Sequence, residues 1–216
     1  MRVDREAVFA AVADERRQLA TLVEGLDAAQ LATPSLCEGW DVKTVAAHVV
    51  STVMDGTPAF LRLALRRLSM ARAIDELARR RARLPAAEIA ASLHRCADRP
   101  ISPPFFGPLD PLADILVHGG DLRIPLGQPF QPDPQLAALA MDFLTGPWPF
   151  GFVPLRRLHG IRMRADDICR VWGTGAEISG PVAALMMAIT GRTALLHLLD
   201  GPGLPQLRRR VSDHSG

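Results

Sequence analysis

The stretch DILVHGGDL, residues 114–122, carries residue types and spacings suited to metal chemistry. On an α-helix, residues four apart lie on one face about one turn apart, so Asp114 and His118 can point the same way and Asp121 stays on that face. A carboxylate oxygen and an imidazole nitrogen placed like this can bind one divalent cation such as zinc. Two ligands are too few, so the pattern requires a third ligand from elsewhere in the chain.

His48 is the candidate third ligand. It lies among valines and alanines in VKTVAAHVV, a run that follows a helix-capping Asp41 and predicts a helix. Helix bundles build metal sites from inward side chains on facing helices, so this helix could meet the one that holds Asp114. A core histidine bonded to a backbone carbonyl, with an Asp/His pair that occurs by chance, is the alternative interpretation, and spacing alone leaves it open.

Four further residues are candidates for the same site. Trp40 could form a wall of a pocket or simply belong to the core, and Gly119 could let a ligand approach the backbone or serve close helix packing. Asp121 is either a helper base or hydrogen-bond partner of the site, or a solvated acid near a helix end. Arg192, after Gly191 at a helix end, either neutralises the helix dipole or contacts an anionic substrate.

The hydrophobic periodicity predicts a helical N-terminal domain and a smaller α/β domain. Apolar residues at spacings of three and four, together with caps at Asp41 and Asp110, predict helices over 4–24, 41–56 with a continuation through 59–74, 85–94, 110–124 and 134–144. Alternation in LHGIRMRADDICRVWG predicts two strands around a turn at 165–167, and SGPVAALMMAITGR predicts a helix capped by Ser179. We therefore expect an α+β protein: a four-helix bundle over residues 1–145 and a small α/β domain over 146–216.

The bulk composition excludes several classes of protein. The net charge of +2 gives no strong attraction to nucleic acid, and the basic segment RRLSMARAIDELARRRAR contains acids but no aromatic residues for base stacking. Three widely spaced cysteines fit neither a disulfide framework nor a CxxC knuckle. A charged N-terminal segment and the lack of a run of about 18 apolar residues predict a cytoplasmic protein with no membrane partner.

Three motifs, in order along nearly the whole chain, resemble one family. CEGWDVKTVAAHVV resembles the Cys-x-Gly-Trp-x-Val…His motif of the mycothiol-dependent maleylpyruvate isomerase family, which belongs to the wider DinB-like metal-binding superfamily. DILVHGGDLRIPLG looks like the second motif of that family. The segment from LHGIRM to ITGR resembles its sterol-carrier-like C-terminal domain. Residues of about 60–105 are the least similar part.

The resemblance implies a fold, a ligand set and a chemistry. It implies a DinB-like bundle that binds one divalent metal, zinc by expectation, through His48, Asp114 and His118, and it places Asp where the isomerase has the longer Glu. It also implies mycothiol as the thiol cosubstrate, which would attack a small electrophile in an isomerase or S-transferase reaction. The alternative function is a non-catalytic metal- or small-molecule-binding protein of the same fold. A monomer or a homodimer is expected.

Overall fold

The computed structural model describes residues 4–102, 107–147, 149, 151–154 and 156–212, and the chain divides into two compact units, 1–130 and 131–216. The sequence analysis placed the domain boundary after residue 145, so the two divisions differ by one helix. That helix, α8 (Pro134–Leu144), packs against α9 (Val182–Ile189) and therefore belongs to the second unit.

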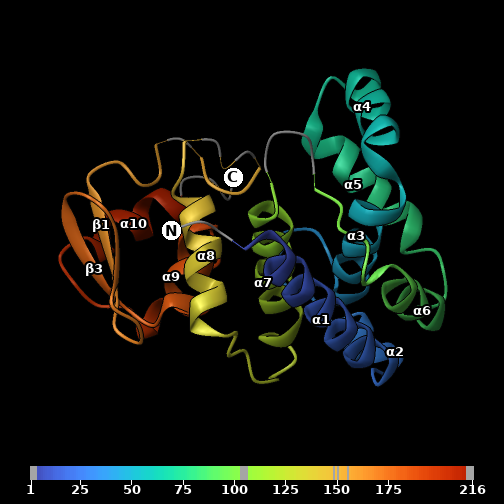
Figure 1. The fold of residues 1–216 in the computed structure, drawn as a ribbon, viewed down its shortest axis with the longest axis horizontal. Helices are drawn as coiled ribbons and strands as arrows, with labels where there is room; N and C mark the ends of the chain where they lie inside the picture. Colours follow the sequence, from blue (N-terminus) through green and yellow to red (C-terminus); the bar gives the residue numbers. More distant parts are fainter. Residues whose placement is uncertain (1–3, 103–106, 148, 150, 155, 213–216) are drawn as a thin grey trace. The chain divides into compact units, whose positions relative to one another are not determined.

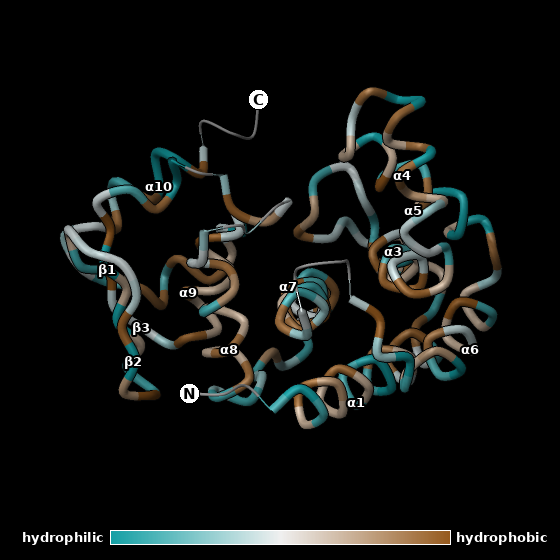
Figure 2. The backbone as a smooth tube through the Cα atoms, turned by 45° about the horizontal axis from the view of Figure 1, so that its top comes forward, coloured by the Kyte–Doolittle hydropathy of each residue, from teal (hydrophilic) through white to brown (hydrophobic). Residues whose placement is uncertain are grey.

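The first unit is built on a ring of four helices (Figure 1). Helix α1 contacts α6 and α7, and α3 contacts the same two helices. This closed arrangement is the expected four-helix bundle, and Figure 2 shows hydrophobic and hydrophilic residues alternating along α1, as an amphipathic helix requires. The helices of this unit are α1 (Arg5–Glu24), α2 (Ala28–Leu31), α3 (Val42–Met54), α4 (Gly56–Arg67), α5 (Met70–Arg81), α6 (Ala86–Cys96) and α7 (Leu109–Arg123).

Helices α4 and α5 form a hairpin beyond α3, where the sequence predicted one continuing helix. The chain breaks at Leu68, whose φ of 50° is left-handed, and the side chain of Ser69 then caps α5 by accepting from the Arg72 amide. Helix α5 packs against α3 through Ala73, Leu77 and Ala78, which are buried. The hairpin thus adds a second layer outside the bundle.

The two helices that matter for the site begin in different ways. Helix α3 starts as predicted, because the Asp41 carboxylate accepts a 2.7 Å hydrogen bond from the Thr44 amide. Helix α7 starts two residues earlier than an N-cap at Asp110 would place it, with Pro108 at the cap, so the expectation that Asp110 is the N-cap was wrong. Asp110 lies in the first turn, where a negative charge still suits the helix dipole. All of α7 from 111 to 122 is buried except Asp114, which is partly exposed.

The second unit is a three-stranded sheet with helices on it. Strands β1 (Ile161–Ala165) and β2 (Arg170–Gly173) form the predicted antiparallel pair, and β3 (Ala176–Gly180) adds a parallel strand, giving the order β2-β1-β3. Helix α9 lies between the sheet and α8 in Figure 1. The unit ends with a 3₁₀ turn (Leu196–Leu198) and α10 (Leu204–Ser212).

The third strand overturns one expectation about helix capping. Ser179 lies within β3 and does not cap α9. The cap comes instead from Asp167, whose carboxylate accepts from the Val182 amide at 3.0 Å. Because Asp167 lies in the β1–β2 turn, fifteen residues before α9, a local sequence pattern could not reveal it.

The α+β class is confirmed, because the described residues are mostly helical and include a small three-stranded sheet. Among the described residues, every helix is too short or too polar to cross a lipid bilayer.

Candidate metal centre

Helix α7 supplies two of the three candidate ligands. Asp114 and His118 lie one turn apart on the same face, as their spacing predicts, with 3.5 Å between Asp114 Oδ1 and His118 Nε2. The His118 side chain is only 9% exposed and that of Asp114 17%. The pair therefore lies almost entirely below the surface, where polar groups need partners.

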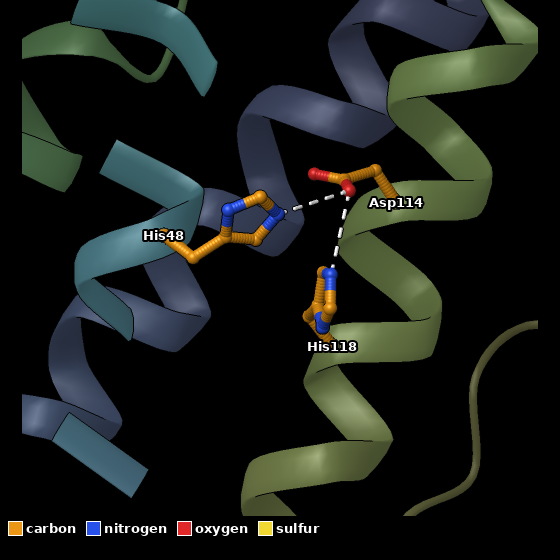
Figure 3. A group of neighbouring side chains, drawn as sticks. All are labelled: His48, Asp114 and His118. Carbon is orange, nitrogen blue, oxygen red and sulfur yellow. Dashed lines mark ion pairs between the residues drawn. The ribbon is translucent and has the colours of Figure 1, made fainter. Parts of the chain in front are cut away.

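Helix α3 brings the third candidate to the same carboxylate. His48 Nε2 lies 3.7 Å from Asp114 Oδ1, so both imidazoles turn toward one oxygen atom (Figure 3). The buried stripe of α3 on either side of His48 packs this helix against α7. The facing-helix arrangement expected for His48 is therefore present.

These three groups have the dimensions of a ligand set. One ligand atom from each residue lies within 4.8 Å of the other two. Atoms bound at about 2.1 Å to a tetrahedral ion lie roughly 3.4 Å apart, close to the separations from Asp114 to each histidine. Two nitrogens and a carboxylate oxygen are also a donor set that suits zinc and several other divalent metals. The residues present thus fit a divalent cation.

Asp121 is fully buried and contacts the far side of the His118 ring. Its Oδ2 lies 2.9 Å from His118 Nδ1. In the neutral tautomer that donates from Nδ1 to this carboxylate, the Nε2 lone pair is available to a cation. The alternative interpretation of Asp121 as a solvated acid near a helix end is therefore wrong.

The His48 ring has a different environment. Its Nδ1 atom is buried and has no hydrogen-bond partner among the described residues. One neighbour of the ring is Trp40, with centroids 5.1 Å apart and the planes tilted by 46°. The centroid of the Trp40 ring also lies 6.5 Å from that of the His118 ring, so the indole is a neighbour of both imidazoles. Trp40 therefore lies beside the cluster, and its role as a pocket wall stays a prediction.

Charge around the cluster favours the forms that bind a cation. Burial lowers the pKa of His48, which keeps this imidazole neutral. Burial alone would raise the pKa of Asp114, but the two imidazoles and the Arg16 guanidinium hold it below its ordinary value. Arg16 is a buried residue of α1 whose Nη1 donates to the carbonyls of Ala97 and Arg99.

Asp110 is a second acid on α7, one turn before Asp114. Burial, and then the negative charge of Asp114, raise the pKa of Asp110 to about 7. The sequence analysis considered this residue only as a helix cap. It missed Arg16 altogether, because nothing in the sequence of α1 distinguishes a buried arginine from a solvated one.

The two remaining candidates lie in different units. Gly119 is buried within α7, beside His118, and a Cβ atom there would come within 2.8 Å of Arg123 Nη1. Arg192 lies in the second unit, where its Nη1 donates to the Thr190 carbonyl at the end of α9. Its position after a helix fits the interpretation of a dipole-neutralising cation.

Fold and site together define a class: a four-helix bundle with a buried His/Asp/His cluster, joined to a small α/β unit. Residues 12–102 match the family model of the mycothiol maleylpyruvate isomerase N-terminal domain. No curated protein matches the sequence.

Two solved structures share the fold over nearly the whole chain. One is the crystal structure of the mycothiol-dependent maleylpyruvate isomerase, with a TM-score of 0.61 and 14% identity over 92% of both chains. The other is a histidine-to-alanine mutant of that enzyme, with a TM-score of 0.59 at the same identity and coverage. The similarity extends through the second unit, beyond the part that the family model matches.

Proposed function

We propose that this chain is a metal-dependent enzyme that uses mycothiol, a low-molecular-weight thiol, to act on a small electrophilic substrate. The observation that carries the proposal is the cluster of His48, Asp114 and His118, whose ligand atoms lie within 4.8 Å of one another on facing helices. The family match and the two isomerase structures that share the fold support the thiol and the class of substrate.

The three residues act as the ligand set, with zinc as the proposed metal. Three protein ligands leave at least one position open, as in catalytic rather than structural zinc sites. A divalent cation held here would lower the pKa of a bound thiol and so favour the nucleophilic thiolate at neutral pH. Asp121 holds His118 in the tautomer that binds through Nε2, and burial keeps the His48 ring neutral.

The organic steps take place between the thiolate and a substrate whose double bond is conjugated to a carbonyl group. The sulfur forms a bond to the electrophilic carbon, the π electron pair moves to the carbonyl oxygen as an enolate, and the former double bond becomes a single bond that can rotate. Elimination then restores the double bond and releases the thiol, which completes an isomerisation. In an S-transferase reaction the enolate carbon would instead take up a proton, equal to the one that the thiol lost, and the thioether adduct would be the product.

The first experiment is metal content per chain, measured on protein purified without an affinity tag. We expect about one equivalent of metal in the wild type and almost none in His118→Ala, because two ligands bind a divalent ion weakly. The matched control is His94→Ala, which removes a histidine of the same unit that lies outside the cluster. No metal in the wild type, even after reconstitution with zinc, would contradict the proposal.

A thiol-addition assay separates an enzyme from a binding protein of the same fold. The shorter Asp114 side chain is the specific reason to keep this second function, since the resemblance places a Glu at this position in the isomerase. An enzyme accelerates consumption of the electrophile only when mycothiol and metal are both present. A binding protein leaves the background rate unchanged.

A further inference from the structure

The Trp40 side chain is held by a residue of the α4–α5 hairpin, which lies outside the four-helix bundle. Its indole Nε1 donates a 2.7 Å hydrogen bond to Oδ1 of Asp75, a residue of α5 that lies 35 positions along the chain. A partly buried indole N–H needs an acceptor, and this carboxylate supplies one. The contact therefore sets the direction in which the Trp40 ring points.

Arg79 holds the carboxylate in place. Its Nε donates to the same Asp75 oxygen at 2.8 Å, and its Nη2 donates to the Gly39 carbonyl at 2.8 Å. Arg79 thereby joins the acceptor of the indole to the residue immediately before Trp40. Hydrogen bonds thus join the indole N–H to Asp75, Asp75 to Arg79, and Arg79 back to the carbonyl that precedes Trp40.

The loop backbone leaves Trp40 little freedom. The Trp40 carbonyl accepts from both the amide and the hydroxyl of Ser35, at 3.0 and 2.9 Å, and its amide donates to the Cys37 carbonyl. The Leu36 amide donates to the carbonyl of Asp121, so the loop is also tied to α7. With the backbone fixed, the side-chain torsions decide whether the indole covers the imidazoles, and Asp75 restrains those torsions.

The Asp75–Arg79 ion pair affects the orientation of the Trp40 ring more than it affects the free energy of folding. The Asp75 and Arg79 side chains are 44% and 53% exposed, and exposed ion pairs contribute little to folding free energy. The same indole lies beside the buried His48 ring, with the ring centroids 5.1 Å apart. The Asp75–Arg79 pair, which contributes little to stability, therefore sets the direction of the Trp40 indole beside His48.

We propose that Asp75 is a positioning residue, which with Arg79 holds the Trp40 indole over His48 and His118 and so limits the access of water to the cluster. Its effect on thiol chemistry rests on the proposed function. Its effect on the position of Trp40 does not, because the hydrogen bonds involve no metal or thiol. The two claims can therefore be tested separately.

The test uses ¹⁹F NMR of the full chain labelled with 5-fluorotryptophan, with the Trp40 signal assigned by Trp40→Phe. The change in chemical shift between H₂O and D₂O reports how far each indole is exposed. We expect the Trp40 isotope shift to increase in Asp75→Ala toward the value of an exposed indole. Asp75→Asn should stay near wild type, because an amide oxygen can still accept from the indole. Arg79→Ala should show a smaller increase.

Glu76→Ala is the matched control, since the next residue of α5 is also an ion-paired acid, 29% exposed against 44% for Asp75. Glu76 pairs with Arg67 and Arg80 and makes no contact with Trp40 among the described residues. Its Trp40 signal should match the wild type. An unchanged isotope shift in Asp75→Ala, or an equal change in Glu76→Ala, would overturn the proposal.

Cobalt(II) added to the same samples distinguishes this proposal from the proposed function. A paramagnetic ion at the cluster broadens the Trp40 signal, and more weakly in Asp75→Ala if the ring has moved away. No broadening in any variant, with isotope shifts that still separate Asp75→Ala, rejects the metal site and keeps the positioning role. Broadening of the Trp40 signal, with isotope shifts that are equal in Asp75→Ala and the wild type, keeps the metal site and rejects the positioning role. In the active enzyme, Asp75→Ala should raise KM for the thiol more than it lowers kcat, and Glu76→Ala should change neither.

Discussion

His118 and His48 face the same oxygen of Asp114 but are held in different ways. His118 is braced by Asp121, three residues further along the same helix, through a 2.9 Å contact to Nδ1. His48 has no such partner on Nδ1 among the described residues and instead packs against Trp40, which depends on Asp75 of a third helix. One half of the cluster is thus organised within a single helix, and the other half by residues distant in the sequence.

The difference has a chemical consequence. A hydrogen bond to Nδ1 fixes both the tautomer and the ring direction of a ligating histidine, whereas ring packing fixes the direction alone. We therefore expect the α7 side of the cluster to control affinity for a cation, and the α3 side to be more sensitive to its surroundings.

Asp121→Ala should lower zinc affinity by about 10- to 100-fold, because it removes the brace of a ligating histidine. Isothermal titration of the metal-free protein with zinc measures it. Asp121→Asn should recover part of the loss, since the amide oxygen can accept from Nδ1. Ser92→Ala, which changes another buried polar residue of the first unit, serves as the control. If Asp121→Ala binds zinc as the wild type does, the α7 side is not organised by this contact.

The same division explains what the sequence could predict. Asp114, His118 and Asp121 follow from helical spacing, and the cap at Asp41 placed His48 on its own helix, so three ligands could be proposed before any coordinates. The helices at 5–24 and 134–144 and the β1–β2 pair also follow from local periodicity.

Residues that act through tertiary contacts gave no local signal. Asp75 belongs to a charged helix, and Arg16 to a face that looks solvated in sequence, yet Asp75 accepts from the Trp40 indole and the charge of Arg16 lowers the pKa of Asp114. The break at Leu68 and the parallel strand β3 were missed for a related reason, since packing decided against the continuing pattern.

Asp110→Asn should stabilise the metal-free protein at pH 8 by about 1 to 2 kcal/mol, after allowance for the solvent that reaches part of the carboxyl. With a pKa of about 7, above its ordinary value, Asp110 stays protonated in the folded chain while the unfolded chain loses that proton. Wild-type stability attributable to this group therefore falls as the pH rises from about 4 to about 7.

Urea unfolding at pH 5, 6, 7 and 8 measures the Asp110 effect, and the gain in Asp110→Asn should shrink toward the acidic end. Asp98→Asn, at an exposed aspartate of the same unit, should show no such trend. Equal pH dependence in Asp110→Asn and the wild type would show that α7 tolerates a second carboxylate beside Asp114 without cost.

His48→Gln should alter pH dependence in the opposite sense. Burial lowers the pKa of His48, so the unfolded chain takes up a proton that the folded chain excludes, and stability falls as the pH drops below about 6.5. Glutamine cannot titrate, so the metal-free variant should lose stability less steeply between pH 7 and pH 5. The same urea series measures it, with His94→Gln as the exposed control. An unchanged slope would mean that the ring gains solvent or a partner that the packing against Trp40 does not provide.

Gly119→Ala should have the smallest effect, and it tests whether the local organisation of α7 includes a ligand approach. The new methyl group would meet Arg123 Nη1 at 2.8 Å, but this is the end of a flexible side chain that can move aside. Alanine favours a helix interior over glycine by about 1 kcal/mol, which offsets the displacement, so stability should stay within about 1 kcal/mol of wild type. Zinc affinity should not change. A rise in KM for the thiol with stability intact would place the thiol against the backbone of α7, whereas a large loss of stability would assign Gly119 to packing alone.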